Sequence, residues 1–265
     1  MKLGVIGCGN MATAILSRVV DDKFLSPGDI ICYDVNDAMT KRMAKEFGVQ
    51  EAEGNLEVAS TADALILSVK PQFYAPVIEE IRDAVSDDCC IITMAPGKSL
   101  KWISEKFGKP QLSVIRTMPN TPAMVGEGMT ALCPGEYVTN TQLSFAKGLF
   151  EVCGKTDVVA EYLMDAVVAV SGSSPAYIYI AIEAMADGAV AQGMPRAQAY
   201  KFASQAVLGS AKMVLESGVH PGALKDAVCS PGGTTIAAVS QLEKSGFRAA
   251  ILSAMEKIKE VLKGG

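Results

Sequence analysis

The chain has 265 residues, enough for one large domain or two modest ones. Hydrophobic residues make up 49% of it, and 29 acidic against 24 basic residues give a net charge of −5. That balance argues against nucleic-acid binding, because no positive field would attract phosphate backbones. The start lacks the apolar core of a signal peptide, and no apolar run is expected to be long enough to span a bilayer, so we expect a cytoplasmic protein without a membrane partner.

Seven cysteines and one histidine limit the chemistry that the chain can support. Only Cys89 and Cys90 are close in sequence, adjacent cysteines rarely pair, and no C-x-x-C spacing occurs. The composition therefore favours reduced, buried thiols and predicts neither a disulfide framework nor a metal site.

Short apolar runs alternate with amphipathic stretches over residues 1–160. The alternation predicts strands at 3–6, 30–33, 64–68, 90–93, 112–116 and 157–159, with helices at 11–20, 38–47, 77–85, 100–107 and 142–152. This rhythm is typical of the α/β class, so we expect a Rossmann-type, doubly wound parallel sheet as an N-terminal dinucleotide-binding domain.

The first expected strand leads directly into Gly7-Cys-Gly9-Asn10-Met11-Ala12, a G-x-G-x-x-A motif that opens a helix. Gly7 permits the tight turn, Gly9 lets a pyrophosphate approach the helix N-terminus, and Ala12 allows close packing of helix and strand. Because free N–H groups at a helix N-terminus bind anions, the motif predicts a dinucleotide site that includes Asn10 and Met11.

Asp34 follows the second expected strand, 22 residues after Ala12. An acidic residue there usually binds the adenosine ribose hydroxyls and repels a 2′-phosphate, which favours NAD over NADP. Asn36, Lys41 and Arg42 could soften that preference. Capping of the next helix is an alternative role for Asp34.

The strand signal ends near residue 161, and residues 161–265 predict an all-helical C-terminal domain. A long helix is expected from Pro175 to about residue 191, another after Pro195, and a last one at 248–262. Gly218 is a natural helix-terminating residue. Small side chains such as Ala184 and Gly188 would allow close helix contacts, either within the chain or between subunits.

The segment Cys229-Ser230-Pro231-Gly232-Gly233-Thr234-Thr235 places a turn, two glycines and two hydroxyls before a helical pattern. A helix that starts in this way presents free N–H groups and a favourable dipole to an anion.

Residues 221–243 resemble the signature of the pyrroline-5-carboxylate reductase family. The positions that fit are Pro221, Leu224, Val228, Cys229, Ser230, Gly232, Gly233, Thr235, Ala238, Val239, Leu242 and Glu243. The glycine motif and the segments 67–72, 93–97, 116–122 and 170–177 extend the resemblance over both domains in the same order.

The resemblance implies a cofactor, NADP or NAD, and a set of residues that bind it. Asn55 would lie near the adenosine ribose, a segment after the third strand would line the cofactor, and two later loops would approach the nicotinamide. Pro96 replaces the small residue that is usual in one of those loops. The implied binding residues are Gly7, Gly9, Asn10, Met11, Ala12, Asp34, Asn36, Asn55, Val69, Lys70, Pro71, Ala95, Gly97 and Asn120.

The resemblance also implies reduction of a cyclic imino acid, with no metal ion. A protonated C=N carbon accepts hydride readily, so the protein must align the reactants and hold the carboxylate. Thr235 is the expected catalytic residue, with its hydroxyl on the ring nitrogen. The expected substrate-binding residues are Ser171, Ser230, Gly232, Gly233, Thr234 and Thr235. Ser174 replaces a glycine that is usual near Ser171.

Other functions remain open at this point. An imine reductase for another ring size is one, and a β-hydroxyacid dehydrogenase is another, although residues 174–192 lack the lysine that such enzymes carry there. A non-catalytic dinucleotide-binding protein is a third. The resemblance implies a homodimer or a higher homo-oligomer assembled through the helical domains.

Overall fold

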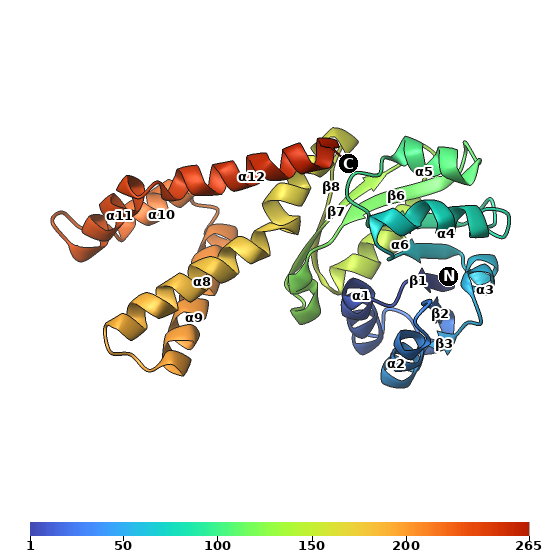
Figure 1. Cartoon of the computed structure of the whole chain (residues 1–265), viewed down its shortest axis with the longest axis horizontal. Helices are drawn as coiled ribbons and strands as arrows, with labels where there is room; N and C mark the ends of the chain where they lie inside the picture. The colour runs from blue at the N-terminus through green and yellow to red at the C-terminus, as the bar shows by residue number, and fades with distance from the viewer. Residues whose placement is uncertain (265) are drawn as a thin grey trace. The chain divides into compact units, whose positions relative to one another are not determined.

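The computed structural model describes residues 1–264, which form two compact units (Figure 1). The first unit comprises Met1–Ser173 and the C-terminal residues from Lys259, and the second comprises Ser174–Ile258. The two units divide after Ser173, later than the expected boundary at 160–161. That boundary stays a prediction of where the functional domains meet.

The first unit is built on one eight-stranded sheet in the order β3-β2-β1-β4-β5-β6-β7-β8. All neighbouring strands are parallel except β6 and β7, which are antiparallel. The expected Rossmann-type topology is therefore confirmed, and the strand order reverses between β1 and β4. The strands are β1 (Leu3–Ile6), β2 (Ile30–Tyr33), β3 (Gln50–Glu51), β4 (Ala64–Leu67), β5 (Cys90–Thr93), β6 (Ser113–Met118), β7 (Gly128–Pro134) and β8 (Gly154–Val158).

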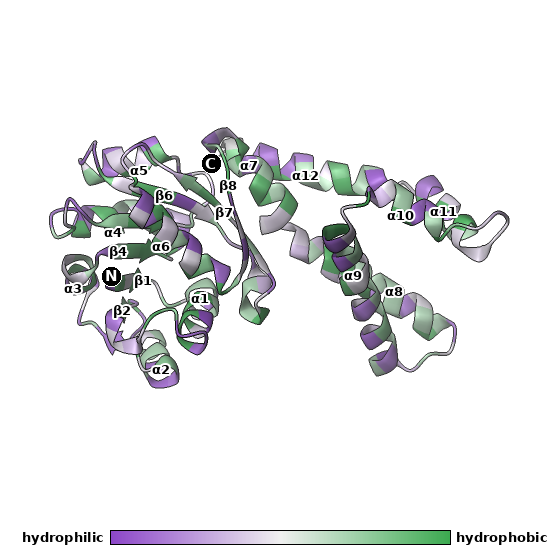
Figure 2. Cartoon of the chain, turned by 180° about the vertical axis from the view of Figure 1, so that it is seen from behind, coloured by the Kyte–Doolittle hydropathy of each residue, from purple (hydrophilic) through white to green (hydrophobic). Residues whose placement is uncertain are grey.

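Helices on both faces of this sheet enclose two hydrophobic clusters. One cluster includes Ile15, Leu16 and Phe150, and the other includes Tyr74 and Ile78. The central strands are buried at every position and mostly hydrophobic, as expected of parallel strands covered on both faces (Figure 2). The helices of this unit are α1 (Asn10–Asp21), α2 (Asp37–Phe47), α3 (Asn55–Thr61), α4 (Tyr74–Ile81), α5 (Leu100–Phe107), α6 (Asn140–Glu151) and α7 (Met164–Val167).

Three strands differ from the sequence-based expectation, because none of them is a continuous apolar run. β3 has only two residues, both polar, and β7 begins with glycine and ends with proline. The strand expected at 157–159 is found earlier, as Gly154–Val158, and much of it is exposed at the sheet edge. The carboxyl ends of β1, β2, β4 and β5, where the dinucleotide motifs lie, are not affected by these differences.

The second unit contains only helices among its described residues. Gly218 ends one of them in the left-handed conformation, at φ 64°, which confirms its expected role. The helices are α8 (Ser174–Ala191), α9 (Arg196–Ser217), α10 (Pro221–Ala227), α11 (Thr234–Lys244) and α12 (Phe247–Gly264), of which α12 ends in the first unit.

The expectation about apolar length is wrong for one segment. Glu161–Ala191 forms a helical run of 31 residues with a hydropathy of 1.3, long and apolar enough to cross a bilayer by those criteria alone. The run is longer than the helix expected from Pro175, because a π-helical turn at Val168–Gly172 joins α7 to α8. Length and composition by themselves are weak evidence for a membrane span.

Candidate functional site

The glycine loop between β1 and α1 fits tightly against the next loop of the sheet. Gly7 has φ 96°, and a Cβ there would lie 2.8 Å from the carbonyl of Ser68. The N–H of Gly7 also donates to the carbonyl of Tyr33 at 2.8 Å. Both the backbone conformation and the space therefore require glycine at this position.

Gly9 has a different reason to be glycine. Its backbone is extended, and a Cβ there would meet nothing within 4 Å. As the N-cap of α1 it offers no side chain, so no side-chain oxygen caps the first turn that holds Asn10, Met11 and Ala12. The open space and uncapped N-terminus fit a bound pyrophosphate, whose close approach a Cβ would block.

These two glycines give a matched test of the loop. Gly7→Ala should destabilise the fold by about 1–3 kcal/mol, because an L-residue at this φ is strained and meets Ser68. Gly9→Ala should leave the thermal midpoint nearly unchanged and weaken nicotinamide-dinucleotide binding at least about tenfold, which is about 1.4 kcal/mol. Thermal unfolding and calorimetric titration of both variants check this, and unchanged cofactor affinity in Gly9→Ala would contradict the assignment.

Asp34 is fixed at the end of β2 by two backbone N–H groups. Its Oδ2 accepts from Cys8 at 2.8 Å, and its Oδ1 accepts from Asn36 at 2.8 Å. The side chain of Asn36 caps α2 by accepting from the N–H of Ala38, so the alternative role of Asp34 as the helix cap is wrong. The carboxylate is instead fastened to the glycine loop.

A cavity of about 270 Å³ opens between the glycine loop and the ends of β2 and β4. Asn55 donates from Nδ2 to Glu80 at 2.8 Å, but its buried Oδ1 has no hydrogen-bond partner in the protein. An unsatisfied acceptor of this kind suits a ribose hydroxyl. The cavity is lined by Ile6, Gly7, Gly9, Tyr33, Asp34, Val35, Asn55, Ser68, Val69, Lys70, Phe73 and Val77.

The loop that follows β4 borders this cavity, and the loop that follows β5 lies at the end of the neighbouring strand. Val69 and Lys70 line the cavity, and Pro71 begins a short 3₁₀ turn. In the next loop Ala95 is buried, whereas Gly97 is exposed at φ 75°. Both loops lie at the carboxyl ends of parallel strands, where such sheets bind ligands.

Asn120 has a different environment from the one expected. Its Nδ2 donates to the carbonyl of Ser171 at 3.0 Å, and its Oδ1 accepts from the N–H of Met129 at 2.9 Å. The hydroxyl of Ser171 donates to the carbonyl of Val167 at 3.1 Å. The Asn120 amide thus orders the segment that carries Ser171, and a direct role for either residue in binding stays a prediction.

The hydroxyl-rich segment of the second unit forms the start of α11. Gly232 is left-handed at φ 70°, and a Cβ on Gly233 would lie 2.4 Å from the Oγ of Ser230. The N–H of Gly233 donates to the carbonyl of Ser230 at 3.0 Å, which closes the turn. No side chain caps α11, so Thr234 and Thr235 occupy an exposed, uncapped first turn. This arrangement can accept a carboxylate.

The predicted cofactor residues all lie in one unit, whereas the predicted substrate-binding residues are divided between the two. The dinucleotide residues and Ser171 belong to the first unit, and Ser230–Thr235 belongs to the second. Sequence reasoning did not identify Tyr33 and Phe73, which also line the cavity. Their only sequence signal is position: Tyr33 is the last residue of β2, and Phe73 lies in the turn that follows β4.

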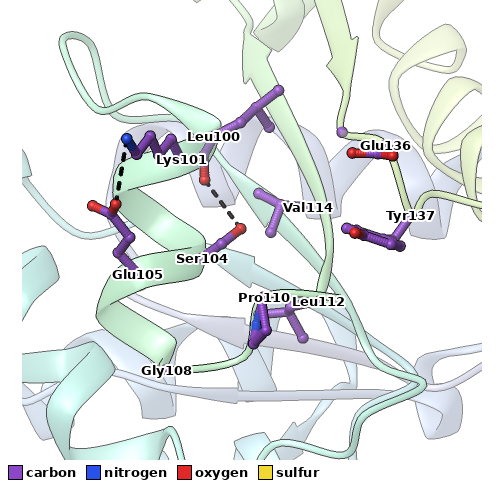
Figure 3. A pocket seen from close by; sticks show the side chains of 11 residues that line it. Leu100, Lys101, Ser104, Glu105, Gly108, Pro110, Leu112, Val114, Glu136 and Tyr137 are labelled. Atoms are coloured by element: carbon purple, nitrogen blue, oxygen red, sulfur yellow. Dashed lines mark hydrogen bonds and ion pairs between the residues drawn. The ribbon is translucent and has the colours of Figure 1, made fainter.

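A larger hollow, of about 490 Å³, runs beside α5 and the start of β6 (Figure 3). Lys101 and Glu105 form an ion pair at 3.7 Å on its rim, and Ser104 donates to the carbonyl of Leu100 at 3.1 Å. Much of it lies at the amino end of β6, opposite the edge where α/β sheets bind dinucleotides. Its size therefore does not make it the cofactor site.

The seven cysteines are all free thiols, six of them buried, and Cys229 is half-buried. Burial raises the pKa of Cys89 and of Cys90 to about 12, so neither forms a thiolate near neutral pH. Within residues 1–264, no group of three or more His, Cys, Asp or Glu side chains is placed to hold a metal ion.

Comparisons with known proteins cover nearly the whole chain. The pyrroline-5-carboxylate reductase dimerisation family matches residues 161–264, and a family described as NADP oxidoreductase coenzyme F420-dependent matches residues 2–97. A pyrroline-5-carboxylate reductase from Escherichia coli is 48% identical over 98% of this chain and 96% of its own length. One from Arabidopsis thaliana is 43% identical over 96% of this chain and 91% of its own length.

Solved structures give the same picture. A pyrroline-5-carboxylate reductase from Coxiella burnetii is 31% identical, with a TM-score of 0.91 over 99% of this chain and 97% of that chain. A pyrroline carboxylate reductase from Plasmodium falciparum, solved with NADP bound, is 28% identical, with a TM-score of 0.91 over 100% of this chain and 97% of that chain.

Proposed function

Because the chain belongs to the pyrroline-5-carboxylate reductase family, we propose that it reduces 1-pyrroline-5-carboxylate to L-proline with NADH or NADPH, the last step of proline biosynthesis. The observation that carries the proposal is the similarity of both units to such reductases. One relative has 48% sequence identity over 98% of the chain. The glycine loop with its cavity and the uncapped start of α11 supply the two kinds of binding site that the reaction needs.

The bound cofactor supplies a hydride to the carbon of the C=N bond. The chain itself binds and orients. Gly7 and Gly9 shape the loop for the pyrophosphate, and the orphan Oδ1 of Asn55 accepts from a ribose hydroxyl. The first turn of α11, with Ser230, receives the substrate carboxylate. The Thr235 hydroxyl holds the ring nitrogen, whose proton completes the amine once the carbon has accepted the hydride.

A labelled cofactor tests the reaction directly. With NADH deuterated at the transferred position and 1-pyrroline-5-carboxylate, proline should carry one deuterium on the ring carbon that belonged to the C=N bond, as read by mass spectrometry. Unlabelled proline, or cofactor oxidation without any imine, would reject the proposal. Binding of NADH without oxidation by any imine would leave a dinucleotide-binding protein.

We further propose that Asp34 favours NADH. Its carboxylate is held in the cavity wall by two N–H groups, so it repels a 2′-phosphate without being able to turn away. The nearby cations are already engaged: Lys41 pairs with Asp37 at 2.7 Å, and Arg42 donates to the Thr13 hydroxyl at 2.8 Å. The Lys41 charge is thus offset by Asp37, whereas Arg42 keeps its charge.

Asp34→Ser should therefore shift the cofactor preference toward NADPH. The ratio of kcat/KM for NADH to that for NADPH should fall about tenfold, since close like charges near a surface repel by about 1–4 kcal/mol. Asp29→Ser removes the same charge from an exposed loop and is the control. An unchanged ratio in Asp34→Ser would mean that the carboxylate only fastens the glycine loop.

The proposal includes a homodimer, alone or within a larger ring, in the cytoplasm. The match of residues 161–264 to a dimerisation family supports a homo-oligomer. Several large apolar side chains on α8 and α9 are exposed in a single copy, which supports their burial against a second copy. Seven free thiols suit a reducing compartment.

A further inference from the structure

The side chain of Tyr74, the first residue of α4, is fully buried beneath the cofactor loops. Its hydroxyl donates to the carbonyl of Leu67, the last residue of β4, at 2.5 Å. The same hydroxyl accepts from the N–H of Met94, the first residue after β5, at 3.1 Å. One phenol oxygen therefore joins the ends of two neighbouring strands.

The hydrogen-bond pattern of the sheet shows what this oxygen replaces. The N–H of Cys90 donates to the carbonyl of Asp63 at 2.9 Å, at the other end of the same pair of strands. Parallel ladders repeat every two residues, so the rung four residues further along would join Met94 to Leu67 directly. The Tyr74 hydroxyl is inserted into that last rung.

An inserted oxygen separates the two strands where their loops begin. Direct donation from Met94 to Leu67 would require about 2.9 Å between nitrogen and oxygen. Two successive bonds through the phenol hold them further apart. The loop after Leu67 contributes Val69 and Lys70 to the dinucleotide cavity, and the loop after Met94 contains Ala95 and Gly97.

The hydroxyl keeps its proton in this position. Burial is the main cause that raises the pKa of Tyr74 to about 12, so the phenol remains neutral at any working pH of the protein. As a neutral hydroxyl it can donate to Leu67 and accept from Met94 at the same time. A phenylalanine would fill nearly the same volume and make neither bond.

We infer that Tyr74 is a positioning residue, whose hydroxyl sets the spacing of the loops after β4 and β5 for the bound nicotinamide dinucleotide. The inference rests on the proposed function only in taking these loops as the cofactor site. It predicts that removal of the hydroxyl changes cofactor affinity through the loops, although Tyr74 itself is buried below them.

Tyr74→Phe is the direct test, measured by calorimetric titration with NADH and with NADPH in the absence of any imine. The dissociation constants should rise about tenfold, because the freed Leu67 and Met94 groups either pair directly and shift the loops or remain unsatisfied. Tyr137→Phe, at a partly exposed tyrosine of the groove beside α5, is the control and should bind both cofactors as the parent does.

A purely structural role gives a different result. If the role is purely structural, Tyr74→Phe should have a lower thermal midpoint but unchanged dissociation constants, measured well below that midpoint. That result would overturn the inference. Cofactor binding is measured without substrate, so it is independent of the proposed reaction. A parent protein that binds the cofactor normally but reduces no imine would contradict the proposed reaction and would not contradict this inference.

Amide exchange of the intact parent protein gives a second test that needs no variant. Binding of NADH should slow exchange in residues 68–73 and 94–98 together, because one hydroxyl couples the two loops. Slowing confined to one of the loops would contradict that coupling, even if Tyr74→Phe proved too unstable to purify.

Discussion

Replacement of Thr235 by alanine should lower kcat for imine reduction roughly 10²-fold, the lower range for loss of a group that positions or transfers a proton. Thr235 lies in the exposed first turn of α11, where its hydroxyl is the expected partner of the ring nitrogen. The dissociation constant of NADH should hardly change, because the dinucleotide cavity is lined entirely by residues of the first unit. Steady-state kinetics and calorimetric titration measure the two quantities separately.

Thr235→Ser is the matched control, since it retains the hydroxyl and removes only a methyl group. It should recover most of the turnover that Thr235→Ala loses. Equal loss of turnover and cofactor affinity in Thr235→Ala, or equal turnover in the alanine and serine variants, would show that Thr235 supports the start of the helix and takes no part in the reaction.

A charge on α8 should disrupt the oligomer. Ile178, Tyr179 and Ile180 are 44%, 59% and 66% exposed in a single copy, and successive helical residues point about 100° apart. A helix that is apolar all round is normally buried, and Figure 2 shows apolar residues along much of α8. The residues of α8 and α9 that a single copy does bury are alanines: Ala186, Ala199 and Ala203. The proposed homo-oligomer would cover these larger side chains with a second copy.

Ile180→Glu places a carboxylate in that surface. Burial of an unpaired charge costs at least about 3 kcal/mol, which raises the dissociation constant of the oligomer by roughly 10²-fold. Gln111→Glu adds the same charge at an exposed position of the first unit and should leave the assembly intact. Light scattering over a concentration series measures the mass, and an unchanged mass in Ile180→Glu would mean that another surface joins the copies.

The sequence predicted the parallel sheet well because its central strands are continuous apolar runs with strong turn signals. It did not predict β3, which is two polar residues long, or β7, which begins with glycine and ends with proline. It also underestimated the run from Glu161 to Ala191, since the acidic residues within it do not break a helix. Local pattern thus indicated the central strands and missed β3 and β7.

For the candidate site, the sequence indicated which segments take part more reliably than what each side chain does. Gly7 and Gly9 share one motif, but only the structure distinguishes the steric need at Gly7 from the open approach at Gly9. The amide of Asn120 proved to be engaged by Met129 and Ser171. The hydroxyl of Tyr74 was not predicted at all, because its partners come from two different strands.

Reduction of the five-membered imino acid can be measured against reduction of a larger ring. The initial rate of NADH and NADPH oxidation is measured with 1-pyrroline-5-carboxylate and with its six-membered homologue. We expect fast turnover of the five-membered ring, much slower turnover of the larger one, and a higher kcat/KM with NADH. Faster turnover of the six-membered ring, or no oxidation with either ring by protein that binds the cofactor, would contradict this expectation.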